Sequence, residues 1–271
     1  ARFLTPEQLD EKRAFLVNPS EVVFSETGCY GVCEGAAMAA ARSNKLDVVK
    51  VKGEGCTIAL SIADDARLPT QGAVGVPQGR LTLIGLGPGD RPWRSVAAQK
   101  ALDDATDWVG FKLYLDIACA DGMPDAKLHS FPIGEEEDRC RYALELAATG
   151  RDVALVCSGD PGIYAMSALV LQLLDESDRK DWRRVKLAFE AGITAMQGAV
   201  AKSGALLGHD FCAISLSDLM TPWDAIERRI AAASISDMVV AFYNPVSMRR
   251  RTQLKRAQTL LLQNRPADTP V

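Results

Sequence analysis

Short apolar segments alternate with amphipathic ones from residue 81 to residue 192, and this alternation constrains the fold more than any other feature. The apolar segments have the length of strands, and one of them is an unbroken apolar run, as expected for a strand buried on both faces. We expect strands at residues 81–87, 107–111, 152–159 and 185–192, separated by helices at residues 94–105, 138–150 and 161–176. Repeated strand–helix units predict a mainly parallel sheet with helices on its faces, so the predicted fold class is α/β.

Three turns rich in small residues follow predicted strands, at the edge where parallel sheets bind their ligands. The first, "GLGPGD" at 85–90, matches a dinucleotide-binding turn only in Gly85 and Gly87. Asp90 occupies the place of the third glycine, where its carboxylate would repel phosphate, and Pro88 removes a main-chain donor. No Gly-Lys-Ser/Thr sequence follows, which excludes a Walker loop. The turn therefore suits either a plain strand–helix connection or a neutral or cationic ligand close to the main chain.

The second and third turns allow the same two interpretations. In the second, Asp160 can cap the next helix and Pro161 can occupy its first position, whereas Gly159 leaves the end of the strand open to a ligand. The third, at 191–195, combines a glycine with the small polar residue Thr194. Three such turns at one edge of a sheet would let a flat, compact ligand lie against the main chain.

Composition excludes several classes of function. The net charge of −4 argues against a nucleic-acid surface, and no apolar run approaches the roughly 20 residues that span a membrane. Only two histidines occur, His129 and His209, so a histidine-rich metal site is excluded, a Ser-His-Asp triad is disfavoured, and we expect no metal. The seven cysteines lack a framework spacing, which indicates reduced thiols in a cytoplasmic protein. Cys29 and Cys33 would share one face if their segment is helical.

The N-terminal quarter has a different pattern. Thr5 and Pro6 are typical of a helix start, residues 31–43 form an alanine-rich helix, and residues 46–53 and 56–63 predict a pair of strands. Residues 65–80 contain several glycines and prolines and show no hydrophobic periodicity, which is typical of a linker. The predicted organisation is a partial domain at 1–64, a linker at 65–79 and the larger domain at 80–271. The chain starts without methionine, and we expect it to be a piece of a longer protein.

Three motifs in a characteristic order and spacing resemble the tetrapyrrole methylase family: "GLGPGD" (85–90), "SGDPGIY" (158–164) and "AGITA" (191–195). The segments 206–230 and 241–254 narrow the resemblance to the branch that methylates C17 of precorrin-3B. The resemblance covers about residues 80–271 and implies two α/β subdomains with a cleft between them. It departs from the family at Ala191, where the family has proline. The family also continues beyond the last residue here, so we expect an incomplete second sheet.

The N-terminal part has a resemblance of its own. Residues 18–41 and 48–63 are similar to the C-terminal domain of cobalamin biosynthesis protein G, the cobalt-precorrin-5A hydrolase. Fusions of that protein with the C17-methyltransferase belong to the family pattern, which would make the whole protein bifunctional. Glu34 could be a carboxylate of the hydrolase, or it could sit at a helix start where the helix dipole favours a negative charge. We expect no hydrolase activity from this part of the domain.

The family resemblance implies transfer of a methyl group from S-adenosylmethionine to C17 of precorrin-3B, with ring contraction to precorrin-4 in cobalamin biosynthesis, by a homodimer. Because the sulfonium carries its own leaving group, the protein has to align donor and substrate rather than supply a nucleophile. The residues expected at the donor are Pro88, Gly159, Asp160, Pro161, Ile163, Tyr164, Thr194, Ala195, Leu216, Tyr243, Asn244 and Pro245. The cations expected at the substrate carboxylates are Lys112, Arg249, Arg250 and Arg251. The catalytic candidates for the proton transfers of ring contraction are Asp90, His209, Asp210 and Ser217.

Alternatives remain open at this point. The protein could methylate another precorrin of the same pathway, or it could be a corrinoid-binding module without catalysis. A dinucleotide-dependent oxidoreductase is a third hypothesis, against which Pro88 and Asp90 count. Among the single residues, His209 could be a structural hydrogen-bonding residue, and the arginine run at 249–251 could be a solvated helix start.

Overall fold

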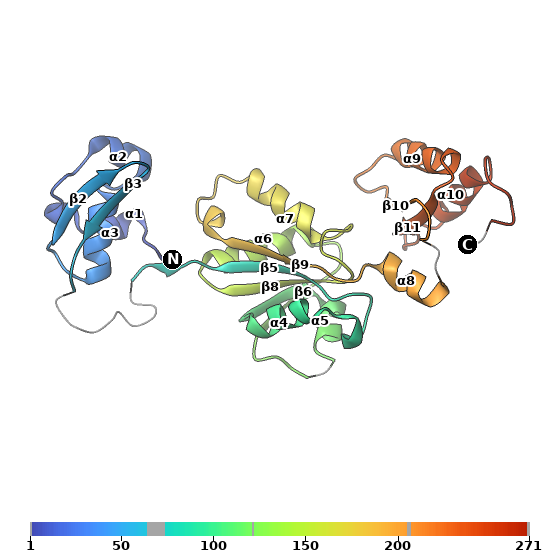
Figure 1. The fold of residues 1–271 in the computed structure, drawn as a ribbon, viewed down its shortest axis with the longest axis horizontal. Coiled ribbons are helices and arrows are strands. Elements are labelled where there is room, and N and C mark those ends of the chain that lie inside the picture. Colours follow the sequence, from blue (N-terminus) through green and yellow to red (C-terminus); the bar gives the residue numbers. More distant parts are fainter. Residues whose placement is uncertain (1, 64–73, 121, 205–206, 270–271) are drawn as a thin grey trace. The chain divides into compact units, whose positions relative to one another are not determined.

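The computed structural model describes residues 2–63, 74–120, 122–204 and 207–269 (Figure 1). The chain divides into two compact units. One contains the residues up to 81 together with 141–153 and 177–188, and the other contains 82–140, 154–176 and 189–271. The candidate functional residues of the predicted larger domain all belong to the second unit.

The N-terminal part combines short helices with an antiparallel hairpin. Its elements are β1 (Arg2–Phe3), α1 (Pro6–Asp10), η1 (Arg13–Phe15), α2 (Glu21–Thr27), α3 (Val32–Ala41), β2 (Val48–Gly53) and β3 (Cys56–Leu60). The predicted helix start is confirmed, because the Thr5 hydroxyl accepts a hydrogen bond from the main-chain N–H of Gln8. Cys29 precedes α3 and is buried, so it does not share a helical face with Cys33.

Most of the predicted linker lies outside the described residues, since the description stops at residue 63 and resumes at 74. The described end of the linker contains β4 (Val76–Pro77), which pairs antiparallel with β1.

A five-stranded sheet forms the centre of the larger domain and confirms the α/β class. Its strands are β5 (Arg80–Gly85), β6 (Asp107–Phe111), β7 (Lys127–Phe131), β8 (Asp152–Cys157) and β9 (Lys186–Glu190). Their order is β7-β6-β8-β5-β9, and β6 and β7 run parallel with Asp107 opposite Lys127. The sequence did not predict β7, because its residues are only partly buried and show no apolar run.

Helices cover both faces of the sheet (Figure 1). They are α4 (Val96–Asp104) and α5 (Lys112–Ala118) on one face, and α6 (Glu136–Ala148) and α7 (Met166–Asp175) on the other. On the first face Ile84, Trp108 and Val156 of the strands form one buried cluster with Leu102 and Leu115 of the helices. This packing keeps water away from the middle of that face of the sheet.

The start of α7 corrects one prediction. The helix begins at Met166 and not at Pro161, so Asp160 is not its cap. The physical reason is Tyr164, whose φ of 52° lies in the left-handed region and interrupts a right-handed helix.

The C-terminal part is a second, smaller α/β arrangement. It comprises α8 (Ala195–Ser203), β10 (Phe211–Ser215), α9 (Trp223–Ile235), β11 (Val239–Tyr243) and α10 (Gln253–Leu261). Strands β10 and β11 are parallel neighbours, with Phe211 opposite Val239 and Ser215 opposite Tyr243. Ile214 and Leu216 pack with Ile226, Ile230 and Ala257 in a buried cluster that holds α9 and α10 against the strands.

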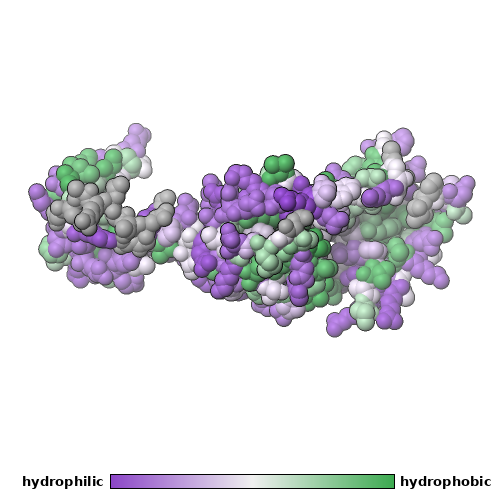
Figure 2. Space-filling model, turned by 90° about the horizontal axis from the view of Figure 1, so that it is seen from below, coloured by the Kyte–Doolittle hydropathy of each residue, from purple (hydrophilic) through white to green (hydrophobic). Residues whose placement is uncertain are grey.

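The face drawn in Figure 2 is mainly polar, with scattered apolar patches. No described helix is both long and apolar enough to cross a membrane. Within the described part of the chain, no three histidine, cysteine or acidic side chains gather in a way that could hold a metal ion.

Candidate functional site

The three predicted turns meet main chain against main chain. Gly87 N–H donates to the Gly159 carbonyl at 3.1 Å, and Gly159 N–H donates to the Gly87 carbonyl at 2.9 Å. A Cβ atom added to Gly85 would lie 2.4 Å from the Gly159 oxygen, and one added to Gly192 would lie 2.0 Å from the same atom. Only glycine fits at these two positions, so the expectation that the three turns share one edge of the sheet is confirmed.

Asp160 ties the second turn to the third. Its Oδ1 accepts a hydrogen bond from Gly162 N–H at 2.8 Å, and its Oδ2 accepts one from Gly192 N–H at 3.1 Å. Both carboxylate oxygens are therefore used to fix main chain. Pro161 is buried and its carbonyl accepts from Ser167 N–H at 2.9 Å, which connects the turn to α7.

Two tyrosines bring the C-terminal part to this edge of the sheet. Tyr164 donates its hydroxyl hydrogen to the Ala213 carbonyl at 2.8 Å, and its ring centroid lies 5.0 Å from that of Tyr243. The Tyr243 hydroxyl is hydrogen-bonded to the buried Thr194 hydroxyl and accepts from Met196 N–H at 3.2 Å. Three of the residues expected at the donor are thus in contact, although 79 positions separate the first from the last.

The remaining donor-site candidates surround these contacts. A Cβ added to Gly198 would lie 2.9 Å from Cγ of Pro88, so the first turn packs closely on α8. Ala195 is the exposed first residue of α8, and the Ile163 side chain is partly exposed. Leu216 is different, because its side chain is completely buried in the C-terminal core and only its main chain could meet a ligand.

The catalytic candidates lie at separate places in the structure. His209 and Asp210 are exposed and precede the first residue of β10, whereas Ser217 follows the other end of that strand. A five-residue strand is about 16 Å long, which separates the two sets. Asp90 is exposed and precedes a 3₁₀ turn, η2 (Arg91–Trp93), without making a side-chain cap.

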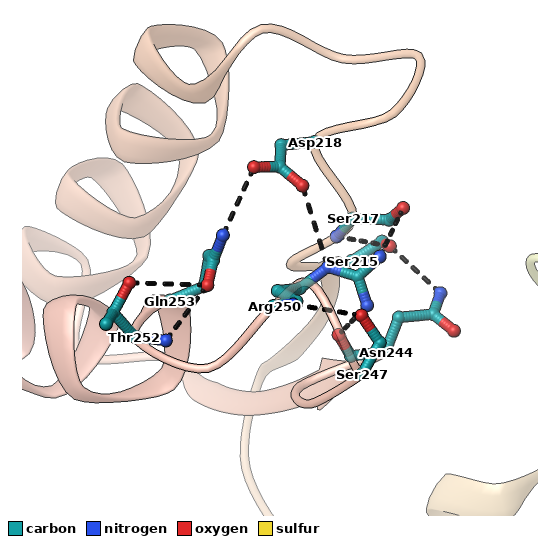
Figure 3. Close-up of polar contacts among 8 residues, drawn as sticks. All are labelled: Ser215, Ser217, Asp218, Asn244, Ser247, Arg250, Thr252 and Gln253. Atoms are coloured by element: carbon teal, nitrogen blue, oxygen red, sulfur yellow. Dashed lines mark hydrogen bonds and ion pairs between the residues drawn. The ribbon is translucent and has the colours of Figure 1, made fainter.

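The cationic candidates also divide. Lys112 is exposed on α5 and forms an ion pair with Asp116 at 2.8 Å. Arg249 and Arg251 are exposed, and Arg251 donates to the Met248 carbonyl. Arg250, in contrast, is buried and bonded to protein groups on several sides (Figure 3), so it is not free to bind a substrate carboxylate.

Asn244 and Pro245 lie in the segment between β11 and α10. Asn244 is exposed and has a φ of 51°, and its side-chain amide donates to the Ser215 hydroxyl at 3.1 Å. Pro245 is half-buried. Sequence reasoning missed the partners Ala213, Met196 and Gly198, because they act through main-chain groups or through the absence of a side chain.

The thiols near the second turn are unsuited to nucleophilic chemistry. Burial raises the pKa of Cys157 to about 11 and that of Cys140 to about 12, so both stay protonated at neutral pH. The site therefore offers shape, main-chain groups and aromatic rings in place of an activated thiol.

Residues 80–271 match the family model described as Tetrapyrrole (Corrin/Porphyrin) Methylases, which covers more than half of the chain. The chain belongs to the tetrapyrrole methylase family. Residues 1–61 match a second family, described as the Cobalamin synthesis G C-terminus. The two matches agree with the resemblances that the sequence motifs indicate.

Similar proteins are known for this tetrapyrrole methylase. A probable cobalt-factor III C(17)-methyltransferase of Salmonella typhimurium is 44% identical over 191 residues, which cover 70% of this chain and 77% of that protein. The precorrin-3B C(17)-methyltransferase of a Sinorhizobium species is 40% identical, with 71% and 75% covered. The cobalamin biosynthesis protein CobIJ of Mycobacterium tuberculosis is 40% identical, but the chain spans only 37% of its length. Among solved structures, the methyltransferase CobJ superposes with a TM-score of 0.64 at 39% identity, covering 70% of this chain and 77% of that one.

Proposed function

We propose that this tetrapyrrole methylase transfers a methyl group from S-adenosylmethionine to C17 of precorrin-3B or its cobalt-containing counterpart, with ring contraction, in cobalamin biosynthesis. The observation that carries the proposal is the main-chain wall formed by the three turns around Gly85, Gly159 and Gly192. Two relatives at 40% identity or more carry the names of C17-methyltransferases, which supports the choice of ring position.

The residues present fit a sulfonium donor. Because Gly85 and Gly192 have no side chains, the three turns pack main chain against main chain, and a ligand at this edge of the sheet would meet main-chain groups. The first turn is hostile to phosphate, since Pro88 has no N–H and Asp90 is an exposed carboxylate. A negative charge close by favours a cationic ligand instead.

Each group in the site has a distinct task in this proposal. S-adenosylmethionine supplies an electrophilic methyl group when bound. Asp160 holds the second and third turns in register, and Tyr164, Thr194 and Tyr243 close the wall from the C-terminal side. Pro88 marks the side from which the substrate approaches. Alignment of two reactants in this way can lower a barrier by roughly 7–11 kcal/mol without a protein nucleophile.

The substrate carries several carboxylates, for which Lys112, Arg249 and Arg251 are the exposed candidates. Of the catalytic candidates, Asp90 and Ser217 are retained, because Asp90 is the last residue of the first turn and Ser217 follows the carboxyl end of β10. His209 and Asp210 are ranked below them because they precede the amino end of that strand.

Incubation of the protein with precorrin-3B and ¹³C-methyl-labelled donor, followed by NMR of the product, tests the proposal. We expect a single labelled methyl carbon bound to C17. A label on another ring carbon would indicate a different methylase of the family. A shift of the tetrapyrrole absorbance without any labelled product would indicate a binding module. Parallel reactions with the cobalt-containing substrate would identify the preferred form.

The assembly and location follow the same line of argument. We infer that the protein works as a homodimer in the cytoplasm and that residues 1–64 are part of a domain fused to the methylase at 80–271 through the segment 65–79. The family resemblance supports the dimer, and the cysteines, which are free in the structure, fit a reducing compartment. Light scattering of the purified protein measures the oligomeric state directly.

The partial N-terminal domain carries no hydrolase proposal. The Glu34 carboxylate is almost fully buried and accepts hydrogen bonds from the N–H groups of Val17, Asn18 and Lys50, and from the Asn18 amide. A carboxylate held by four donors stabilises the fold and has little capacity left to act on a substrate.

A further inference from the structure

Arg250 is a buried arginine that the proposed chemistry leaves without a task. The residue is only 7% exposed, and it lies in the segment between β11 and α10. Nη1 donates to the Asn244 carbonyl at 2.9 Å, Nη2 donates to the Ser217 hydroxyl at 3.0 Å, and Nε lies 3.7 Å from Oδ1 of Asp218 (Figure 3). One guanidinium thus joins the segment after β10 to the segment after β11.

The Arg250 guanidinium is one of the few groups that hold residues 244–249, together with the hydrogen bonds between Ser247 and the Arg250 main chain. None of these residues is buried, and Val246 and Met248 are 64% and 84% exposed, so apolar packing cannot fix the segment. Asn244 has a φ of 51°, in the left-handed region that asparagine adopts more readily than other residues with a Cβ atom. In this conformation its carbonyl accepts from Arg250 and its side-chain amide donates to Ser215.

The segment is directly connected to the site. Asn244 follows Tyr243, whose hydroxyl contacts Thr194 and Met196 at the start of α8 and whose ring lies against Tyr164. A shift of the Asn244 carbonyl therefore moves the Tyr243 ring. Both segments that Arg250 joins follow the carboxyl ends of parallel strands, where α/β sheets bind their ligands.

We propose that Arg250 is a positioning residue for the methyl donor, acting through the Asn244 carbonyl and the Tyr243 ring. This inference rests on the proposed function, because the donor is the ligand that the Tyr164–Thr194–Tyr243 contacts would enclose. Arg250 itself does not touch the donor. Its charge is held by Asp218, which in turn accepts a hydrogen bond from Gln253 at the start of α10 (Figure 3).

Calorimetric binding of S-adenosylhomocysteine to the full chain tests the inference, with wild type measured first. We expect Arg250→Ala to raise the Kd about tenfold. The Kd of Arg250→Lys should lie between those of wild type and Arg250→Ala, because one ammonium group cannot reproduce the several contacts of the guanidinium. In turnover assays the KM for the donor should rise while kcat changes little. A purely structural role would lower the active fraction, and hence kcat, without changing the KM. Arg228→Ala is the matched control, since Arg228 is an exposed arginine of the same part of the chain, paired with Asp224 on α9.

The outcomes separate the two proposals. Wild-type affinity in Arg250→Ala, or a loss of kcat at constant KM, overturns the role of Arg250 and leaves the proposed function intact. Absence of binding to wild type overturns the proposed function and this inference with it. If Arg250→Ala does not fold, Arg250→Lys decides, and wild-type affinity in that variant overturns the inference.

Discussion

Replacing Gly192 with alanine perturbs the wall of the site at its tightest point. The added Cβ would lie 2.0 Å from the Gly159 oxygen and 2.8 Å from the Gly85 carbonyl carbon, whereas ordinary contact begins at 3.4 Å. All of these neighbours are main-chain atoms, so the turns have to move apart by more than about 1 Å because the packed chain has no free space. The movement also strains the two hydrogen bonds between Gly87 and Gly159.

The expected cost follows from these contacts. Overpacking costs about 1–3 kcal/mol and each of the two weakened hydrogen bonds about 1 kcal/mol, which gives roughly 3–5 kcal/mol for Gly192→Ala. For a domain of this size that corresponds to a fall of roughly 6–20 °C in Tm. Affinity for S-adenosylhomocysteine should fall at least tenfold, because the displaced turns form the wall against which the donor is proposed to lie.

Thermal unfolding and calorimetric titration measure both effects. Gly89→Ala is the control, since Gly89 belongs to the first turn but a Cβ there meets nothing within 4 Å. We expect it to match wild type in both assays. Wild-type Tm and affinity in Gly192→Ala would refute the reasoning, because a turn that tolerates a methyl group cannot be packed main chain against main chain.

Three further predictions concern other parts of the chain. Tyr243→Phe removes the hydroxyl bonded to Thr194 and should cost about 1–2 kcal/mol of stability, measured by thermal unfolding, and weaken donor binding. Burial alone would raise the pKa of Glu34, but its hydrogen bonds outweigh burial and lower the pKa below the usual 4.5. The ionised Glu34 carboxylate therefore stabilises the folded protein fully above about pH 4.5, and this stabilisation is lost as the pH falls through the lowered pKa of Glu34. Amide hydrogen exchange should show this pH dependence in the wild type and no such dependence in Glu34→Gln. Because burial raises the pKa of Cys140 to about 12, a disulfide reagent should label exposed Cys56 much faster in the native protein.

Each of these predictions has a contrary result. Unchanged stability in Tyr243→Phe would mean that the hydroxyl contacts contribute nothing. If Glu34→Gln exchanged faster than wild type only at acid pH, the ionised carboxylate would not be the form that stabilises the fold, contrary to what its hydrogen bonds imply. Equal labelling rates for Cys140 and Cys56 would show that the structure around buried Cys140 opens readily.

The sequence by itself determined the class of the fold. Continuous apolar strands separated by amphipathic helices can bury their surfaces only in a parallel sheet covered on both faces, and residues 152–157 illustrate this rule. The sequence also determined that the first turn does not suit phosphate, because Pro88 lacks a main-chain N–H and Asp90 adds a negative charge in any position of the turn. The family followed from motif order and spacing.

Only the tertiary structure decided how single residues are used. Asp160 and Pro161 have the local pattern of a helix start, yet the Asp160 carboxylate accepts a hydrogen bond from Gly192 in the third turn. Local sequence could not predict this contact, because Gly192 is 32 positions away. The three arginines at 249–251 are identical in type, and only packing buries the middle one against the segments after β10 and β11. Local sequence fixes propensity and charge, whereas long-range contacts decide which side chain is desolvated and which main-chain group it meets.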